Sequence, residues 1–162
     1  MAANDVLIRR GTATTLGSAG TTFTLACGSG SGVQSSVFDL GDPHADEYEM
    51  TARVCLAAAP TAGGTLDFYL APTVDAVNYP GGATGADGQY MSSTTLDASL
   101  PSLSYLGSII VAALSGVHYK SMVIAPITRS GSLVMDNNTT AASIILSGLI
   151  TLTPLIPQVQ TA

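Results

Sequence analysis

The sequence predicts an all-β domain, an antiparallel β-sandwich or jelly roll of about eight or nine strands with almost no helix. Short runs of alternating apolar and polar residues, the pattern of a strand with one buried face, recur along the 162 residues. Clusters of Gly, Ser, Pro and Asn separate these runs, and no segment repeats its apolar residues convincingly at helical spacing. A chain of this length makes one ordinary domain, so no second domain is expected.

The N-terminal part is expected to contain three short strands. Residues 6–10 form the first, inside an N-terminal arm of residues 1–20, and two further β-rich runs follow at residues 21–26 and 33–40. Gly- and Ser-rich turns separate the runs. The arm is therefore expected to lead into a single sandwich domain of residues 21–153.

The clearest strand is expected at residues 48–58, where Tyr, Met, Ala, Val and Leu occupy every second position from the start. The turn-forming sequence Pro-Thr-Ala-Gly-Gly follows at residues 60–64, and a second alternating run covers residues 65–71. This order is typical of a β-hairpin. The two runs are therefore expected to pair as antiparallel neighbours.

Further strands are expected at residues 106–114, 117–124, 132–135 and 144–152. The run Asp136-Asn137-Asn138 is interpreted as a break between the last two of them. The core is expected to consist of apolar residues on the inward faces of these strands and of the hairpin. They are Met50, Val54, Leu56, Leu66, Phe68, Leu70, Ile110, Val123, Ile144, Leu146, Ile150 and Leu152.

Residues 72–104 interrupt this rhythm and are expected to form one long loop outside the β core. Loops longer than about 12 to 15 residues are uncommon in compact domains and are usually functional or disordered. Tyr79 and Tyr90 within the segment and Tyr105 at its exit favour packing against another surface. At the other end of the chain, residues 154–162 have the proline spacing of an extended tail.

The chain carries few charges. Only 10% of its residues are charged, whereas a typical globular domain has about 25%. A net charge of -6 with five basic residues argues against a nucleic-acid-binding surface. Because a free monomer normally keeps about a quarter to a third of its surface charged, other subunits are expected to cover part of this one in a homo-oligomer.

Neither a signal peptide nor a membrane span is expected. In residues 1–10 the apolar triplet precedes the two arginines, an order that differs from that of a secretory signal. The longest apolar runs, residues 109–114 and 144–152, are shorter than the roughly 18 residues that a membrane helix requires. No membrane partner is therefore expected.

The titratable residues do not form a recognisable catalytic or metal-binding motif. The acidic segment 42–49 includes His44, but its spacing matches no calcium loop, and a solvated loop before a strand is the favoured interpretation. His118 is expected on the outer face of a sheet. Cys27 and Cys55 are expected to be free thiols, because a domain of this size builds its core without a disulfide. No enzymatic activity, metal or cofactor is expected.

A family resemblance is carried by four segments. These are MTARV at residues 50–54, PTAGGTLDFYLAP at 60–72, NYPGG at 78–82 and ITLTP at 150–154. Over roughly residues 50–155 the chain resembles small virion structural proteins of tailed bacteriophages, and is most similar to β-rich capsid decoration (cement) proteins that bind outside the major capsid shell. The resemblance implies a β-sandwich or jelly-roll body, symmetric oligomers on the head and no cofactor. It assigns no residue a role.

The expected function is that of a non-enzymatic structural virion protein, made in the host cytoplasm, that binds the major capsid protein lattice and stabilises the head. The resemblance suggests a trimer. Apolar residues of the arms and the long loop are expected to contact partners, namely Leu7, Tyr79, Tyr90, Leu155 and Ile156. Two alternatives remain open: a tail or head-completion protein, and a carbohydrate-binding host-attachment module that stacks sugars on tyrosine rings. The absence of Trp counts against the second of these.

Overall fold

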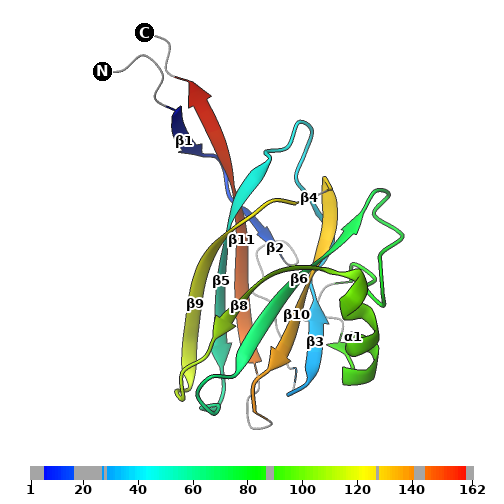
Figure 1. Cartoon of the computed structure of the whole chain (residues 1–162), viewed down its shortest axis with the longest axis vertical. Coiled ribbons are helices and arrows are strands. Elements are labelled where there is room, and N and C mark those ends of the chain that lie inside the picture. The colour runs from blue at the N-terminus through cyan, green and yellow to red at the C-terminus, as the bar shows by residue number, and fades with distance from the viewer. Residues whose placement is uncertain are drawn as a thin grey trace.

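The protein is a sandwich of two antiparallel β-sheets (Figure 1). The structure, a computed structural model, describes residues 6–16, 27, 29–86, 90–126, 128–140 and 145–159. The all-β sandwich that the sequence predicts is confirmed. The described residues form eleven strands, because short strands at residues 14–16 and 90–91 add to those expected and the run expected at residues 33–40 is divided into two.

The first sheet has the strand order β1-β11-β5-β9, and β2 pairs with β11 beside β1. Its strands are β1 (Val6–Arg10), β2 (Thr14–Leu16), β5 (Glu47–Leu56), β9 (Gly116–Ile124) and β11 (Ile145–Val159). The second sheet has the order β7-β3-β10-β6-β8, and β4 pairs with β10. Its strands are β3 (Ser31–Gln34), β4 (Phe38–Asp39), β6 (Thr65–Thr73), β7 (Tyr90–Met91), β8 (Ser104–Ile110) and β10 (Ser130–Asn138).

The main core lies between the two sheets. Along β5 every second side chain from Tyr48 onward is buried, which is the alternation expected of a strand with one face on the core. Eight of the twelve predicted core residues are buried, namely Met50, Val54, Leu56, Leu66, Phe68, Leu70, Ile150 and Leu152. Ile144, and the side chain of Leu146, lie outside the described part of the structure.

Two predicted core residues are wrong. Ile110 is 72% exposed and Val123 is 61% exposed, while their neighbours Ile109 and Ile124 are buried. A shift of one residue moves a side chain to the other face of a strand, and β8 also contains a register irregularity opposite Phe68 and Tyr69 in β6. The same reversal in β9 corrects the expectation for His118. It pairs with Val54 and so lies on the side of the strand that faces the core.

The predicted hairpin of residues 48–58 and 65–71 is also wrong. β5 pairs with β11 and β9 in the first sheet, whereas β6 pairs with β10 and β8 in the second. The intervening turn therefore connects the two sheets. In β5 and over residues 65–70 of β6 only one face is buried, and such a face fits either sheet equally well.

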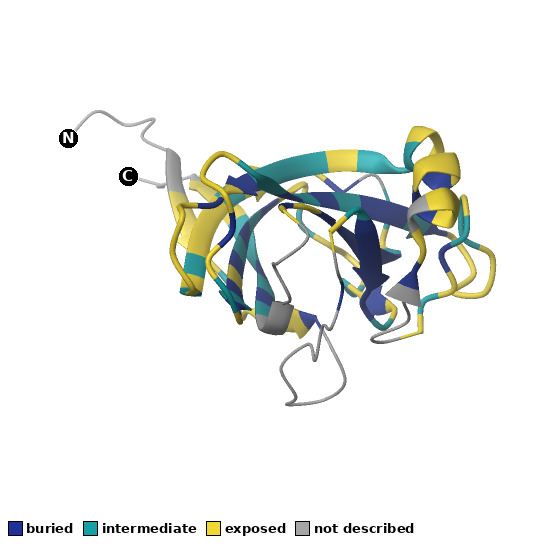
Figure 2. Ribbon diagram, turned by 90° about the horizontal axis from the view of Figure 1, so that it is seen from below, coloured by how far each residue is buried: buried dark blue, intermediate teal, exposed yellow. Residues whose placement is uncertain are grey.

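Residues 72–104 leave the sheets as expected, but they are not one irregular loop. They include β7, the helix α1 (Ser93–Ser99) and the 3-10 helix η1 (Leu100–Ser102), which cover the outer face of the second sheet. Leu96 and Met91 pack there against Ala71 and Val134 in a second apolar cluster. Figure 2 shows exposed residues on the outer side of this helix and buried ones beneath it.

The predicted break at residues 136–138 belongs instead to β10. Asn137 is buried, and its Nδ2 donates to the carbonyl of Cys27 at 3.1 Å while its Oδ1 accepts the Thr139 amide at 3.1 Å. Internal hydrogen bonds thus replace the solvent that a turn residue would need. The strand expected at residues 21–26 lies outside the described residues. No helix among those described is long and apolar enough to cross a bilayer.

Candidate functional site

The two ends of the described chain form a ribbon that projects from the sandwich (Figure 1). β11 pairs with β5 as far as Leu155 opposite Glu47, and beyond that point it pairs only with β1. We call the paired residues 6–10 and 155–159 the terminal ribbon. Residues 6–10 and 155–159 of the two arms that the sequence predicts are therefore extended and paired with each other.

Both faces of the terminal ribbon carry apolar side chains. Ile8 pairs with Pro157 and Arg9 pairs with Ile156, so the two isoleucines lie on opposite faces. Ile8 is 64% exposed and Ile156 is 42% exposed. Apolar side chains on one face of a strand normally point toward a core. Here both faces of the ribbon carry them, and no core covers Ile8 or Ile156.

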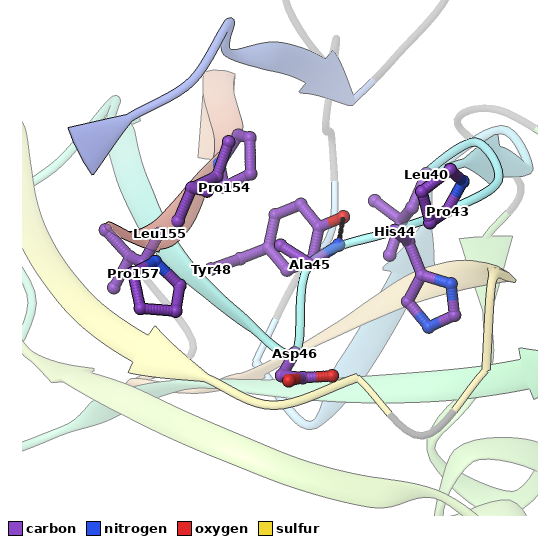
Figure 3. Close-up of a pocket in the computed structure, with 10 residues that line it drawn as sticks. Leu40, Pro43, His44, Ala45, Asp46, Tyr48, Pro154, Leu155 and Pro157 are labelled. Atoms are coloured by element: carbon purple, nitrogen blue, oxygen red, sulfur yellow. Dashed lines mark hydrogen bonds between the residues drawn. The ribbon is translucent and has the colours of Figure 1, made fainter. Parts of the chain in front are cut away.

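A groove of about 330 Å³ lies where the ribbon joins the sandwich (Figure 3). We call it the basal groove. One wall is the loop between β4 and β5, and the other is the stretch of β11 that begins the ribbon. Its lining residues are Leu40, Pro43, His44, Ala45, Asp46, Tyr48, Pro154, Leu155, Ile156 and Pro157.

The loop wall is held in place by hydrogen bonds at both ends. Arg129 donates to the two carboxylate oxygens of Asp39 at 2.6 and 2.7 Å, and the Gly41 amide donates to the same side chain at 2.9 Å. The bonds from Arg129, and then that from Gly41, lower the pKa of Asp39 to about 2. At the other end, the Ala45 amide donates to the Tyr48 hydroxyl at 3.1 Å (Figure 3).

The rim of the groove is acidic. Asp46 and Glu47 are exposed, and together with Ile8, Leu155 and Pro157 they line a second hollow beside the first. One arginine of the ribbon is already paired on the outer side of this sheet, because Arg10 lies 2.8 Å from Glu49.

The groove offers contact surface more than reactive chemistry. Its walls consist mainly of aliphatic, proline and tyrosine side chains, with His44 and Asp46 as its only titratable groups besides Tyr48. In the part of the chain that the structure describes, no three His, Cys, Asp or Glu side chains gather as metal ligands. Such a surface suits an apolar protein segment that carries positive charge.

The remaining titratable residues singled out from the sequence lie elsewhere. The Nε2 atom of His118 is 3.1 Å from the carbonyl oxygen of Leu114. Cys27 and Cys55 are free thiols, as expected, and burial raises the pKa of Cys27 to about 12. A thiol with so high a pKa is a poor nucleophile.

The five predicted contact residues are only partly brought together. Leu155 and Ile156 line the basal groove, and Leu7 pairs with Gln158 in the ribbon, although its side chain is not among those described. Tyr79 instead packs on the second apolar cluster, and its hydroxyl donates to the Ala76 carbonyl at 3.3 Å. Tyr90 lies in β7, with its side chain also undescribed.

The sequence interpretation did not identify the other wall of the groove. Leu40, Ala45 and Tyr48 lie more than one hundred residues before residues 154–157, the part of β11 that faces them. The prolines at 154 and 157 were the available local signal, but proline is normally confined to the edge of a sheet, whereas β11 lies between β1 and β5. No protein-family model matches the chain, and no curated protein sequence matches it significantly.

Proposed function

We propose that this protein is a non-enzymatic structural subunit of a virion, which binds the exterior of a tailed-phage capsid as a decoration subunit and stabilises the head. The observation that carries the proposal is the terminal ribbon. It extends from a closed sandwich and exposes apolar side chains on both faces, as an assembly contact does before its partner is bound.

The composition supports the same proposal. Only 10% of the residues are charged, and charged side chains are depleted at the cores of protein interfaces. A subunit that is surrounded by neighbours needs fewer charges than a dispersed monomer.

The choice of a capsid partner rests on the resemblance to decoration proteins over roughly residues 50–155. The sandwich body agrees with that resemblance, although a β-sandwich by itself carries many unrelated functions. The partner proposed is therefore the major capsid protein lattice, with self-association of the subunit on that lattice.

The proposal is tested by electron microscopy of the phage particle that contains this protein, with a small tag added to the loop between β5 and β6. That loop lies at the end of the sandwich away from the ribbon (Figure 1), and its residues 61–63 are exposed. Density for the tag at symmetry-related positions on the outer head surface is the expected result. Density on the tail, at the head–tail junction or nowhere on the particle would overturn the proposal, and the first two would favour the tail or head-completion alternative.

A further inference from the structure

We propose that the terminal ribbon of one copy docks into the basal groove of a second copy, so that subunits associate through the ends that carry the ribbon and the groove. This inference rests on the proposed structural function and specifies the contact by which subunits join. It is argued from the instability of the ribbon alone, from the sheet edges and from charge.

The ribbon requires a partner for its own stability. A two-stranded ribbon is at best marginally stable in water, and this one has no third strand beyond Glu47, where β5 begins. Its five paired positions extend about 17 Å. Exposed Ile8 and Ile156 gain burial only if another surface covers them.

The described sheet edges also favour this side of the molecule for association. At β9, the Nζ of Lys120 donates to the Ser108 carbonyl at 2.6 Å, and β8 carries a register irregularity. A charge and a bulge are both features that block strand addition. The outer edge of β1, Val6–Arg10, has neither a proline nor an irregular register, and Glu49 neutralises Arg10, so Arg9 is the one charge on it without an ion-pair partner among the described residues.

Complementary charge favours the ribbon of a second copy as the occupant of the groove. Among the described residues there are two ion pairs, Arg10 with Glu49 and Arg129 with Asp39. Asp46 and Glu47 at the groove therefore have no basic partner in that part of the chain, and Arg9 on the ribbon has no acidic one. The exposed arginine and isoleucines of the ribbon match the acidic rim and apolar walls of the groove.

The ribbon cannot fill the groove of its own subunit. Ile156 and Pro157 already form a wall of that groove, and the ribbon continues away from the sandwich (Figures 1 and 3). The outer part of the ribbon can instead bind in the groove of a second copy. Because each copy carries both a ribbon and a groove, a reciprocal exchange of ribbons gives a two-fold dimer, and successive contacts close into a ring when the rotation between subunits permits.

The test uses two charge reversals, Arg9→Glu and Asp46→Arg, and their mixture. Association is measured by sedimentation velocity over a concentration series of the isolated protein. Each variant alone is expected to associate about tenfold or more weakly than the original chain, because like charges then meet at the contact. In an equal mixture, the unchanged Arg9 of one variant meets the unchanged Asp46 of the other. The two introduced side chains also have opposite charges, so association should be restored.

Rescue by mixing distinguishes a contact between copies from one within a copy, because an internal ion pair cannot be repaired by a second chain. Arg53→Glu is the matched control, since Arg53 is an exposed arginine on β5 of the same sheet, and it should leave association unchanged. The inference is overturned if the original chain stays monomeric, if either variant associates normally, or if mixing gives no rescue. These results are independent of where the protein lies on a particle, so the capsid proposal can fail while this inference stands, and the reverse.

Discussion

At the scale of single residues, Asp136 is an acid held away from water. It is 3% exposed, its Oδ2 accepts from Asn138 Nδ2 at 2.7 Å, and its Oδ1 has no hydrogen-bond partner in the described structure. Burial, with a smaller contribution from the nearby Asp67 carboxylate, raises its pKa to about 6 against the opposing effect of the Asn138 bond. The folded protein therefore binds this proton more tightly than the unfolded chain does.

Asp136→Asn should stabilise the protein at neutral pH. A raised pKa in the folded state means that Asp136 lowers stability as pH rises through the window from about 4 to above 6. The amide has no charge to bury, so the free energy of unfolding at pH 7 should rise by about 1 to 2 kcal/mol, with little change at pH 4. Urea denaturation at the two pH values measures this difference. Asp42→Asn at an exposed acid is the control and should show no such gain.

Gln34 fixes the covering segment to the second sheet through its side-chain oxygen. The Oε1 atom accepts the amides of Thr84 at 2.7 Å and Gly85 at 3.0 Å, and the residue is fully buried. Gln34→Met keeps the volume but removes the acceptor. We expect a loss of about 1 to 2 kcal/mol in chemical denaturation, because two part-buried amides lose their acceptor. The loss is partly offset because the buried Gln34 Nε2, which has no hydrogen-bond partner in the described structure, is removed at the same time. Gln158→Met at an exposed glutamine should be neutral, and equal effects at the two sites would contradict this role.

At the scale of secondary-structure elements, the register of β8 can be tested with two adjacent isoleucines. Ile109 is 3% exposed and pairs with Leu66, whereas Ile110 points to solvent. Ile109→Ala should cost about 2 to 5 kcal/mol, since it leaves a cavity in the core. Ile110→Ala should stay within about 0.5 kcal/mol. Denaturant midpoints compare the two variants directly, and the reverse order would show that the assigned register is wrong.

At the scale of the whole molecule, the sandwich and the ribbon should be separable. Removing residues 156–162 keeps Leu155 and Pro154, which pair with Glu47 and Tyr48 of β5, but removes the strand opposite β1. The sandwich should therefore melt cooperatively with a β-type circular dichroism spectrum, while self-association in sedimentation is lost. A truncated chain that is unfolded would show that the ribbon belongs to the core, and one that associates normally would exclude the ribbon as the contact.

The sequence by itself determined the fold class and the position of most strands. In β5 and β6 the period-two alternation is strong, and it also identified Met50, Val54, Phe68 and their neighbours as core. That signal is local, because a strand with one buried face shows it whatever its partners are. Leu155 and Ile156 could also be chosen from a local signal, because they are apolar residues in a tail outside the predicted sandwich domain.

Only the tertiary structure decided which strands pair and which face is inward where the pattern is weak. β5 and β6 separate into different sheets, and β8 and β9 present Ile109 and Ile124 in place of Ile110 and Val123. Strand pairing joins residues far apart in sequence, and a shift of one position exchanges the two faces, so no local pattern specifies it. The basal groove depends on the same long-range pairing. Its two walls come together only because β11 pairs with β5 along its length and continues beyond Glu47, the first residue of β5.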